Sequence, residues 1–281
     1  MSIGLTGEDL VLAYQATTVV HGVSLQLRAG HVTALIGPNG SGKSTVLRSL
    51  ARLHRVSEGR VQVGLDGALV DAAPLSGRDF ARQVTLLSQS RPHPSGLAVR
   101  DVVAFGRHPH RRRFSPLAEA DRGAIDRAMS LTGVADMADR AVDQLSGGEL
   151  QRVWLATCLA QGTGVVLLDE PTNHLDLRFQ VEILELVHEL ADEHDAALGV
   201  VLHDLNHAAL VADEVVLLHH GLVFERGAPE DVLTGPHLSE VYGLPIQATV
   251  DPESGLVRVE PCGTTRLRSR SRPPTPHGGN P

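Results

Sequence analysis

The feature that most constrains this chain is a glycine-rich segment that directly follows an apolar strand. Residues 31–36 have the length and apolar composition of a buried strand. The next nine residues fit the spacing G-x-x-x-x-G-K-[ST], and they are Gly37, Pro38, Asn39, Gly40, Ser41, Gly42, Lys43, Ser44 and Thr45. A helical pattern follows from Ser44 to about Leu53. Strand, glycine loop and helix in this order let backbone N–H groups converge on one point, so the segment predicts a phosphate site within an α/β fold.

Lysine usage supports this interpretation independently. Lys43 is the only lysine in the chain, and all other basic side chains except histidine are arginine. Arginine carries a broad planar fork, whereas lysine carries a compact charge on a thin stem. A crowded loop around phosphates has room for lysine and not for arginine, so we interpret Lys43 as functional, paired with the β- and γ-phosphates.

Composition excludes several classes of protein. The 281 residues have a net charge of −8, although residues 264–281 hold four arginines and no acid. An acidic body argues against nucleic-acid binding, which needs a basic surface. We find no signal peptide and no apolar run near the ~18 residues that span a bilayer. Cys158 and Cys262 show neither disulfide-framework nor zinc spacing, which favours a reducing, cytoplasmic compartment.

The chain divides into an α/β domain, 1–263, and a Ser/Arg/Pro/Gly-rich tail, 264–281, that we expect to be disordered. Residues 3–35 and 58–90 look rich in strands. Residues 97–162 have helical periodicity and predict an inserted helical subdomain. The α/β pattern resumes at residues 165–170, continues through a helix and the strand 198–202, and ends in a hairpin around Gly221.

A second part of the phosphate site follows an apolar strand. Asp169 ends the strand Val165–Asp169 and would hold Mg²⁺ together with the Ser44 hydroxyl, as in other P-loop nucleotidases. Glu170 follows directly and could polarise an attacking water. Many buried strands end in acids, so the pair is informative only together with the glycine loop.

A third motif adds a second anion site. Leu145-Ser146-Gly147-Gly148-Glu149-Leu150-Gln151 reads as a helix start, with Ser146 as N-cap and Glu149 three residues later as in a capping box. The two consecutive glycines also expose backbone N–H groups at a helix N-terminus. One chain therefore carries two half-sites for phosphate.

Taken together, these motifs resemble the ATP-binding subunit of ATP-binding-cassette (ABC) transporters, over about residues 5–245. The counterparts occur in the family's order: Walker A 37–45, Gln89, the signature 145–149, Walker B 165–170, Asp176 and His203. The resemblance implies a P-loop NTPase (RecA-like) α/β core with an antiparallel β-subdomain and an inserted α-helical subdomain, which binds ATP and Mg²⁺.

The resemblance also implies a mechanism. Two copies would form a homodimer around two ATP molecules, head to tail, so that Lys43 of one copy and Ser146, Gly147 and Gly148 of the other close on the same nucleotide. Glu170 would activate water and His203 would contact the γ-phosphate. Gln89 would contact Mg²⁺ or water and move with the coupling helix of a membrane partner. Tyr14 would stack on adenine; the alternative for Tyr14 is an ordinary strand aromatic.

Three shorter sequence segments indicate one subgroup of this family. Residues 105–111, 171–176 and 202–206 resemble the ATPases of iron-siderophore, haem and cobalamin importers. This implies transmembrane permease subunits, an external substrate-binding protein and a peripheral location on the cytoplasmic face of the membrane. The nucleotide site does not encode cargo, so this expectation rests on resemblance alone.

Other classes of protein and other types of site fit the sequence less well. A GTPase would need an Asn-Lys-x-Asp motif, which a chain with Lys43 as its only lysine cannot contain. A cassette acting on DNA, RNA or ribosomes would normally show a second cassette or a coiled coil, whereas this sequence shows one cassette and no sustained heptads. An exporter is the nearer alternative, although many exporters fuse the cassette to a membrane domain. His219-His220 could suggest a metal, but we favour a turn because no further ligand lies at suitable spacing. The basic run 108–113 is more typical of a subdomain loop than of a nucleic-acid patch.

Overall fold

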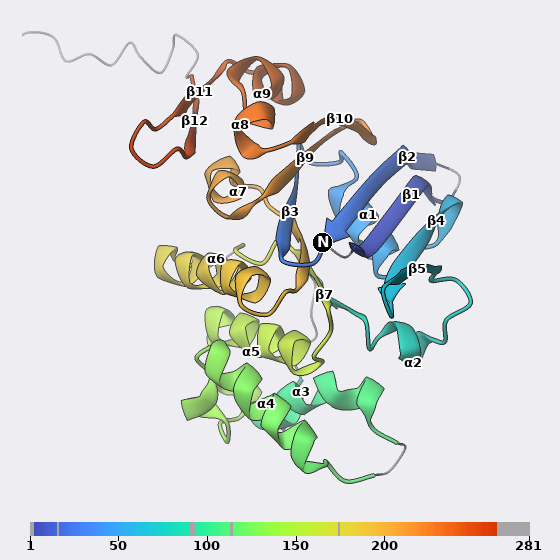
Figure 1. The fold of residues 1–281 in the computed structure, drawn as a ribbon. Helices are drawn as coiled ribbons and strands as arrows, with labels where there is room; N and C mark the ends of the chain where they lie inside the picture. Colours follow the sequence, from blue (N-terminus) through green and yellow to red (C-terminus); the bar gives the residue numbers. More distant parts are fainter. Residues whose placement is uncertain (1–2, 16, 90–93, 113–114, 174, 263–281) are drawn as a thin grey trace, which may run out of the picture.

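The core of the protein is a six-stranded sheet with the order β10-β9-β3-β8-β7-β6. The computed structural model describes residues 3–15, 17–89, 94–112, 115–173 and 175–262 (Figure 1). The strands of this sheet are β3 (His31–Ile36), β6 (Val84–Leu87), β7 (Val165–Asp169), β8 (Ala197–Val201), β9 (Glu214–His219) and β10 (Leu222–Gly227). Strands β3, β6, β7, β8 and β9 run parallel, and β10 pairs antiparallel with β9. Parallel strands buried on both faces read as continuous apolar runs, which explains the patterns at 165–169 and 197–201.

A second, antiparallel sheet packs against the first. Its order is β2-β1-β4-β5, formed by β1 (Ile3–Tyr14), β2 (Thr17–Arg28), β4 (Val56–Leu65) and β5 (Ala68–Asp71). Leu5 and Leu25 from this sheet share one buried cluster with Leu35 and Leu167 from the parallel sheet. Helix α1 (Lys43–Leu50) adds Leu47 and neighbouring side chains to the same cluster. The glycine loop that precedes α1 is therefore anchored at both ends in a packed core.

Helices cover the other face of the parallel sheet. These are α6 (Leu177–Asp192) and α7 (Leu205–Val211). Side chains alternate along each strand, so Val166 and Leu168 of β7 face this layer while Leu167 faces the opposite one. Both faces of β7 are thus buried, which holds the acidic residues at its end in a defined place.

The helical subdomain has an apolar cluster of its own. It contains α3 (Val99–Val103), the 3₁₀ helices η1 (Ala104–His110), η2 (Ala135–Met137) and η3 (Val142–Gln144), and the helices α4 (Glu119–Leu131) and α5 (Gly147–Ala160). Val102, Ile125 and Val153 are buried together in this cluster. Figure 1 shows α3, α4 and α5 grouped at one end of the molecule, in green. The short helix α2 (Gly77–Phe80) lies between the antiparallel sheet and β6 in the chain.

The C-terminal part forms elements that the pattern analysis did not predict. They are α8 (Pro229–Val232), α9 (Gly235–Tyr242) and the hairpin β11 (Ile246–Val250) with β12 (Val257–Pro261). Helix α7 was also not predicted, and α1 ends at Leu50 rather than near Leu53. The tail 264–281 lies outside the described residues. Among the residues that are described, no helix is long and apolar enough to cross a membrane.

Candidate functional site: a nucleotide site at the carboxyl edge of the parallel sheet

Four parallel strands deliver the expected site residues to one edge of the sheet. In the strand register Leu35 of β3 lies beside Val201 of β8, and Val201 lies beside Asp169 of β7. The carboxyl ends of these strands therefore lie side by side, which is where ligands bind in open α/β sheets. The glycine loop leaves β3, Glu170 leaves β7, His203 leaves β8, and Gln89 follows β6.

The Walker A loop is tightly enclosed by neighbouring backbone. Gly37 has φ +140°, and a Cβ there would lie 2.1 Å from the carbonyl oxygen of Leu218. Gly42 has φ +102°, and a Cβ there would lie 2.8 Å from Val20. Only glycine fits these two positions, because both lie in the left-handed region and both meet other atoms. The loop conformation is thus determined by the β9 and β2 segments packed around it.

Lys43 is held within this loop. Its ammonium group donates hydrogen bonds to the carbonyl oxygens of Gly37 at 2.7 Å and Pro38 at 2.9 Å. The residue is 5% exposed. Burial lowers the pKa of Lys43 below its ordinary value, against the opposing effect of the Glu170 and Asp169 charges. A compact cation in a desolvated loop is suited to bind phosphate oxygens strongly.

Ser44 and Asp169 face each other across the site. The Ser44 hydroxyl donates to Oδ1 of Asp169 at 2.7 Å, and the Arg48 guanidinium lies 3.4 Å from Oδ2. Asp169 is fully buried, and burial raises its pKa, while the hydrogen bond from Ser44 and the charge of Arg48 act in the opposite direction. A hydroxyl and a carboxylate are the oxygen ligands that Mg²⁺ takes, so this pair fits a divalent cation.

Glu170 is held from three sides. Its Oε1 lies 2.6 Å from Nε2 of His203, and its Oε2 accepts hydrogen bonds from the side-chain amides of Gln89 at 2.6 Å and Asn173 at 2.5 Å. Its φ is +56°, which a residue with a Cβ rarely adopts. A residue with a strained backbone and a side chain fixed by several partners is typical of a functional site.

The signature segment forms the expected helix start. Ser146 caps α5 by accepting from the Glu149 N–H at 3.3 Å, and the Glu149 carboxylate accepts from the Ser146 N–H at 2.7 Å. The hydrogen bond from the Ser146 N–H foremost, and then one from the Ser146 side chain, hold the pKa of the Glu149 carboxyl below its ordinary value. A Cβ at Gly147 would meet no atom of this chain within 4 Å. The fold of one chain therefore does not itself require glycine at this position.

Within one chain the two half-sites are not joined. Helices α1 and α5 lie apart in Figure 1, with α5 in the helical subdomain. Asp176, which belongs to the same set of motifs, caps α6 by accepting from the Phe179 N–H at 3.0 Å. Gln151 of α5 donates to the carbonyl oxygen of Pro171, so the signature helix is connected to the segment that follows Glu170.

Tyr14 and the adjacent His219 and His220 are the remaining positions that the sequence singled out. Tyr14 is 46% exposed at the end of β1, and its ring lies 4.5 Å from that of His54 between centroids. The rings of His219, the last residue of β9, and His220, in the turn to β10, lie 4.0 Å apart between centroids and are tilted by 34°. Across the described part of the chain, no group of three or more His, Cys, Asp or Glu side chains is arranged to hold a metal ion.

Three residues of the site were not predicted. Arg48 pairs with Asp169, and its position one helical turn after Ser44 was a usable signal. Asn173 contacts Glu170 from the turn after β7. Tyr242 of α9 is the third: burial raises its pKa to about 12, while the Gly37 N–H donates to its hydroxyl. Nothing in the local pattern could have linked residue 242 to the loop 205 positions earlier.

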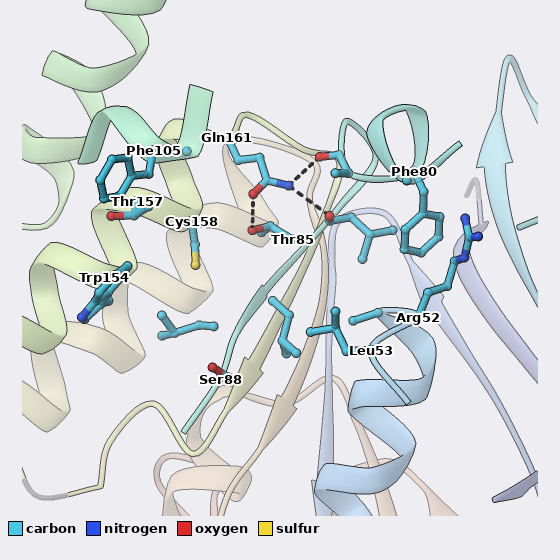
Figure 2. Close-up of a pocket in the computed structure, with 17 residues that line it drawn as sticks. Arg52, Leu53, Phe80, Thr85, Ser88, Phe105, Trp154, Thr157, Cys158 and Gln161 are labelled. Carbon is cyan, nitrogen blue, oxygen red and sulfur yellow. Dashed lines mark hydrogen bonds between the residues drawn. The ribbon is translucent and has the colours of Figure 1, made fainter. Parts of the chain in front are cut away.

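A cavity of 480 Å³ lies between the core and the helical subdomain. Figure 2 shows Arg52, Phe80 and Thr85 on the core side and Phe105, Trp154 and Gln161 on the other. The strand β6 forms its central wall and leads to Gln89. The cavity therefore borders the segment that connects to Glu170.

This fold and this site define a P-loop nucleoside triphosphatase of the cassette type. The glycine loop stands between strand and helix, Asp169 and Glu170 end a neighbouring strand, and a capped Ser-Gly-Gly helix start lies in an inserted helical subdomain. Residues 20–173 match the family described as ABC transporter, and the chain belongs to that family. It is an ATP-binding cassette, and the predicted fold class is confirmed.

Similar proteins cover nearly the whole chain. The ferric enterobactin transport ATP-binding protein FepC of Escherichia coli K12 is 41% identical over 93% of this chain and 95% of its own length. The probable siderophore transport system ATP-binding protein YusV of Bacillus subtilis 168 is 39% identical over 98% of both chains. Among solved structures, a metal-chelate-type ABC transporter in an inward-facing conformation superposes with a TM-score of 0.80 at 28% identity, covering 94% of this chain and all of the other.

Proposed function

We propose that this chain is the ATP-hydrolysing subunit that powers import of an iron-siderophore or related metal chelate through a separate membrane permease. The observation that carries the hydrolytic part is the Glu170 carboxylate, fixed by His203, Gln89 and Asn173 next to the Ser44–Asp169 pair. The import part is supported by relatives at about 40% identity that are named for ferric enterobactin and siderophore transport.

The Walker A loop would bind the phosphates of ATP. Backbone N–H groups of residues 37–45 and the buried Lys43 ammonium provide positive potential where the β- and γ-phosphates would lie. Ser44 and Asp169 would hold Mg²⁺, which when bound would neutralise phosphate charge. The exposed ring of Tyr14, which lies tilted against that of His54, would provide an aromatic surface for adenine.

Glu170 would act as the general base. A carboxylate can accept a proton from the attacking water, provided that it is oriented within hydrogen-bond reach. Gln89 and Asn173 occupy Oε2 of Glu170, and His203 lies next to Oε1. His203 would then contact the γ-phosphate, and Gln89 would sense the metal or the water.

Two copies would be needed for a complete site. The exposed Gly147 has room for an approaching ligand, and the α5 N-terminus carries the dipole and free N–H groups that bind anions. In a head-to-tail homodimer, Ser146, Gly147 and Gly148 of one copy would reach the nucleotide held by Lys43 of the other. A dimeric cassette is known among proteins of similar fold.

The permease would bind at the cavity of Figure 2, on the cytoplasmic face of the membrane. The apolar side chains that line the cavity, Phe80, Phe105 and Trp154, suit a short apolar segment of a partner. The β6 wall of the cavity leads to Gln89. An external substrate-binding protein would deliver the chelate to the permease on the opposite side.

Uptake of radioactive iron siderophore tests this proposal directly. Cells that lack this chain would be compared with cells rescued by the native chain or by Lys43→Ala. We expect rescue by the native chain alone. Unimpaired uptake without the chain would contradict iron-siderophore import, and the same cells would then be tested with haem and cobalamin.

A further inference from the structure

The side chain of Gln161 crosses the boundary between the helical subdomain and the parallel sheet. Gln161 follows directly on α5, and its amide nitrogen donates to the carbonyl oxygens of Ala81 at 2.5 Å and Val84 at 3.2 Å. Its amide oxygen accepts from the Thr85 hydroxyl at 3.0 Å (Figure 2). All three partners belong to the core, and Thr85 is only 4% exposed. One amide thus satisfies three polar groups at the edge of the cavity.

The main chain of Gln161 fixes the other side of the boundary. Its carbonyl oxygen accepts from Arg107 at 3.2 Å and lies 2.7 Å from Nε2 of His110, both in η1. Arg107 also donates to the carbonyl oxygen of Ala160 and to Asp121 of α4. The end of α5, η1 and α4 are therefore joined at one point, to which the Gln161 side chain attaches the core.

The packing of η1 against α5 leaves little freedom there. A Cβ at Gly106 would lie 2.1 Å from the carbonyl oxygen of Thr157 and 3.1 Å from the Gln161 nitrogen. A second connection between core and subdomain, from Arg78 and Arg82 to the carbonyl oxygen of Pro109, uses exposed guanidinium groups. Exposed hydrogen bonds of this kind compete with water, whereas the Gln161 contacts, like that of Gln151 with Pro171, are part-buried.

We propose that Gln161 is a positioning residue that sets the orientation of the helical subdomain relative to the nucleotide-binding core. The subdomain carries Ser146 and Gly147, and the core carries Lys43, so their relative orientation determines whether the half-sites of two copies meet. The same amide holds the start of β6, which leads within four residues from Thr85 to Gln89 and its hydrogen bond to Glu170. The catalytic consequence rests on the proposed roles of these site residues; the orientation itself does not.

The test uses Gln161→Glu, which keeps the shape of the side chain but cannot donate to Ala81 and Val84 when ionised. Thr85→Val removes one of the three hydrogen bonds and keeps the volume. Gln247→Ala, at an exposed position on β11, is the control. In Gln161→Glu we expect kcat for ATP to fall about tenfold, because the helical subdomain is misplaced relative to the nucleotide-binding core. KM should stay within about twofold, because the Walker A loop is untouched.

A distance measurement separates orientation from chemistry. Spin labels would be placed at Arg60→Cys on the antiparallel sheet and Arg127→Cys on α4, both exposed, in a Cys262→Ser background. We expect a shifted or broadened label-to-label distance in Gln161→Glu, a smaller change in Thr85→Val and none in Gln247→Ala.

Unchanged distances in Gln161→Glu would overturn the proposal, whatever the activity. A lower melting temperature with native distances and native kcat would also overturn it, since that result describes a purely structural residue. If Glu170 proved not to be the base, the distance result would still decide the role of Gln161.

Discussion

Lys43 is the residue at which the requirement for one side-chain type is sharpest. Its ammonium group donates to two loop carbonyls at 2.7 and 2.9 Å within a loop that Val20 and Leu218 enclose. For Lys43→Arg we expect a loss of ATPase activity of about 100-fold, because the guanidinium fork cannot occupy the space of an ammonium group. Phosphate release measured at saturating ATP checks this. Near-native hydrolysis would show that charge alone is sufficient here.

Glu170 allows the chemical step to be separated from binding. Gln has the same shape and can still contact Gln89, Asn173 and His203, but it cannot accept the proton. We expect Glu170→Gln to lose about 1000-fold in turnover while retaining ATP in a stable dimer. Single-turnover hydrolysis and size-exclusion chromatography with ATP measure the two properties. Gln180→Ala, which removes only a long contact to Thr172, serves as a nearby control. Normal turnover in Glu170→Gln would exclude this residue as the base.

At the scale of elements, the Arg107–Asp121 ion pair joins η1 to α4 inside the helical subdomain. Nε of Arg107 lies 2.9 Å from Oδ1 of Asp121, and both side chains are about nine-tenths buried. Asp121 also accepts from the Ala118 N–H at the start of α4. We expect Asp121→Ala to cost about 3 kcal/mol of unfolding free energy, because the buried Arg107 guanidinium keeps its carbonyl partners but loses its counter-charge.

Urea denaturation measures this cost, and the chain offers a matched control. Asp126→Ala breaks the exposed pair with Arg100, in which both side chains are about half exposed. Such pairs contribute at most about 1 kcal/mol. Equal effects of the two substitutions would show that burial of the Arg107–Asp121 pair is unimportant.

The same carboxylate predicts a pH dependence. Burial would raise the pKa of Asp121, but hydrogen bonds from Arg107 and the Ala118 N–H outweigh it, so the pKa is lowered. A depressed pKa in the folded state stabilises the fold above the unfolded-state pKa of about 3.9 and loses that effect as pH falls through the folded value. The difference in unfolding free energy between native chain and Asp121→Ala should therefore be constant from about pH 7 to 5 and decrease below about 4. A difference that grows on acidification would contradict this.

The elements also show what local patterns can and cannot reveal. Strands β3, β7 and β8 were predictable because burial on both faces produces unbroken apolar runs. Helix α1 ends before Leu53 because Arg52 takes φ +58°, which the apolar pattern does not encode. The short helix α9, with Pro236 in its first turn, packs against β11, and β12 packs against α7. These elements depend on contacts with distant parts of the chain and were missed.

The site divides in the same way. Lys43 and Ser44 follow from the spacing of the glycine loop, which places them at the start of the next helix. Asp169 and Glu170 follow from the end of an apolar strand. Tyr242 contacts the Walker A loop only through the tertiary fold. The attachment of Gln161 to Thr85 likewise joins residues 76 positions apart and leaves no local signature.

For the whole molecule, the main consequence of the proposed function is that one chain would hold two incomplete phosphate sites. Gly147 is exposed and meets nothing in its own chain, whereas Gly37 and Gly42 are required by their own surroundings. In the proposed dimer, two-fold symmetry repeats each contact, so the glycine loop of each chain would meet the signature segment of the other and both sites would be complete. A site shared between two chains predicts that two inactive variants can restore activity together, which a site within one chain does not predict.

Chains carrying Lys43→Ala and chains carrying Gly147→Asp should complement each other when mixed. Each variant alone forms dimers in which both composite sites are damaged. A mixed dimer has one site with both defects and one site that is fully native, so ATP hydrolysis should reappear, at about half the native rate per dimer if the sites act independently. Differently tagged chains, purified through both tags in sequence, isolate this species for phosphate-release measurements. If each chain instead used its own signature helix, the mixed dimer would be as inactive as either parent. If the two sites hydrolyse only in concert, the mixed dimer would still bind one ATP tightly at its native site, and equilibrium binding of a labelled nucleotide distinguishes that outcome from a failure of the composite site.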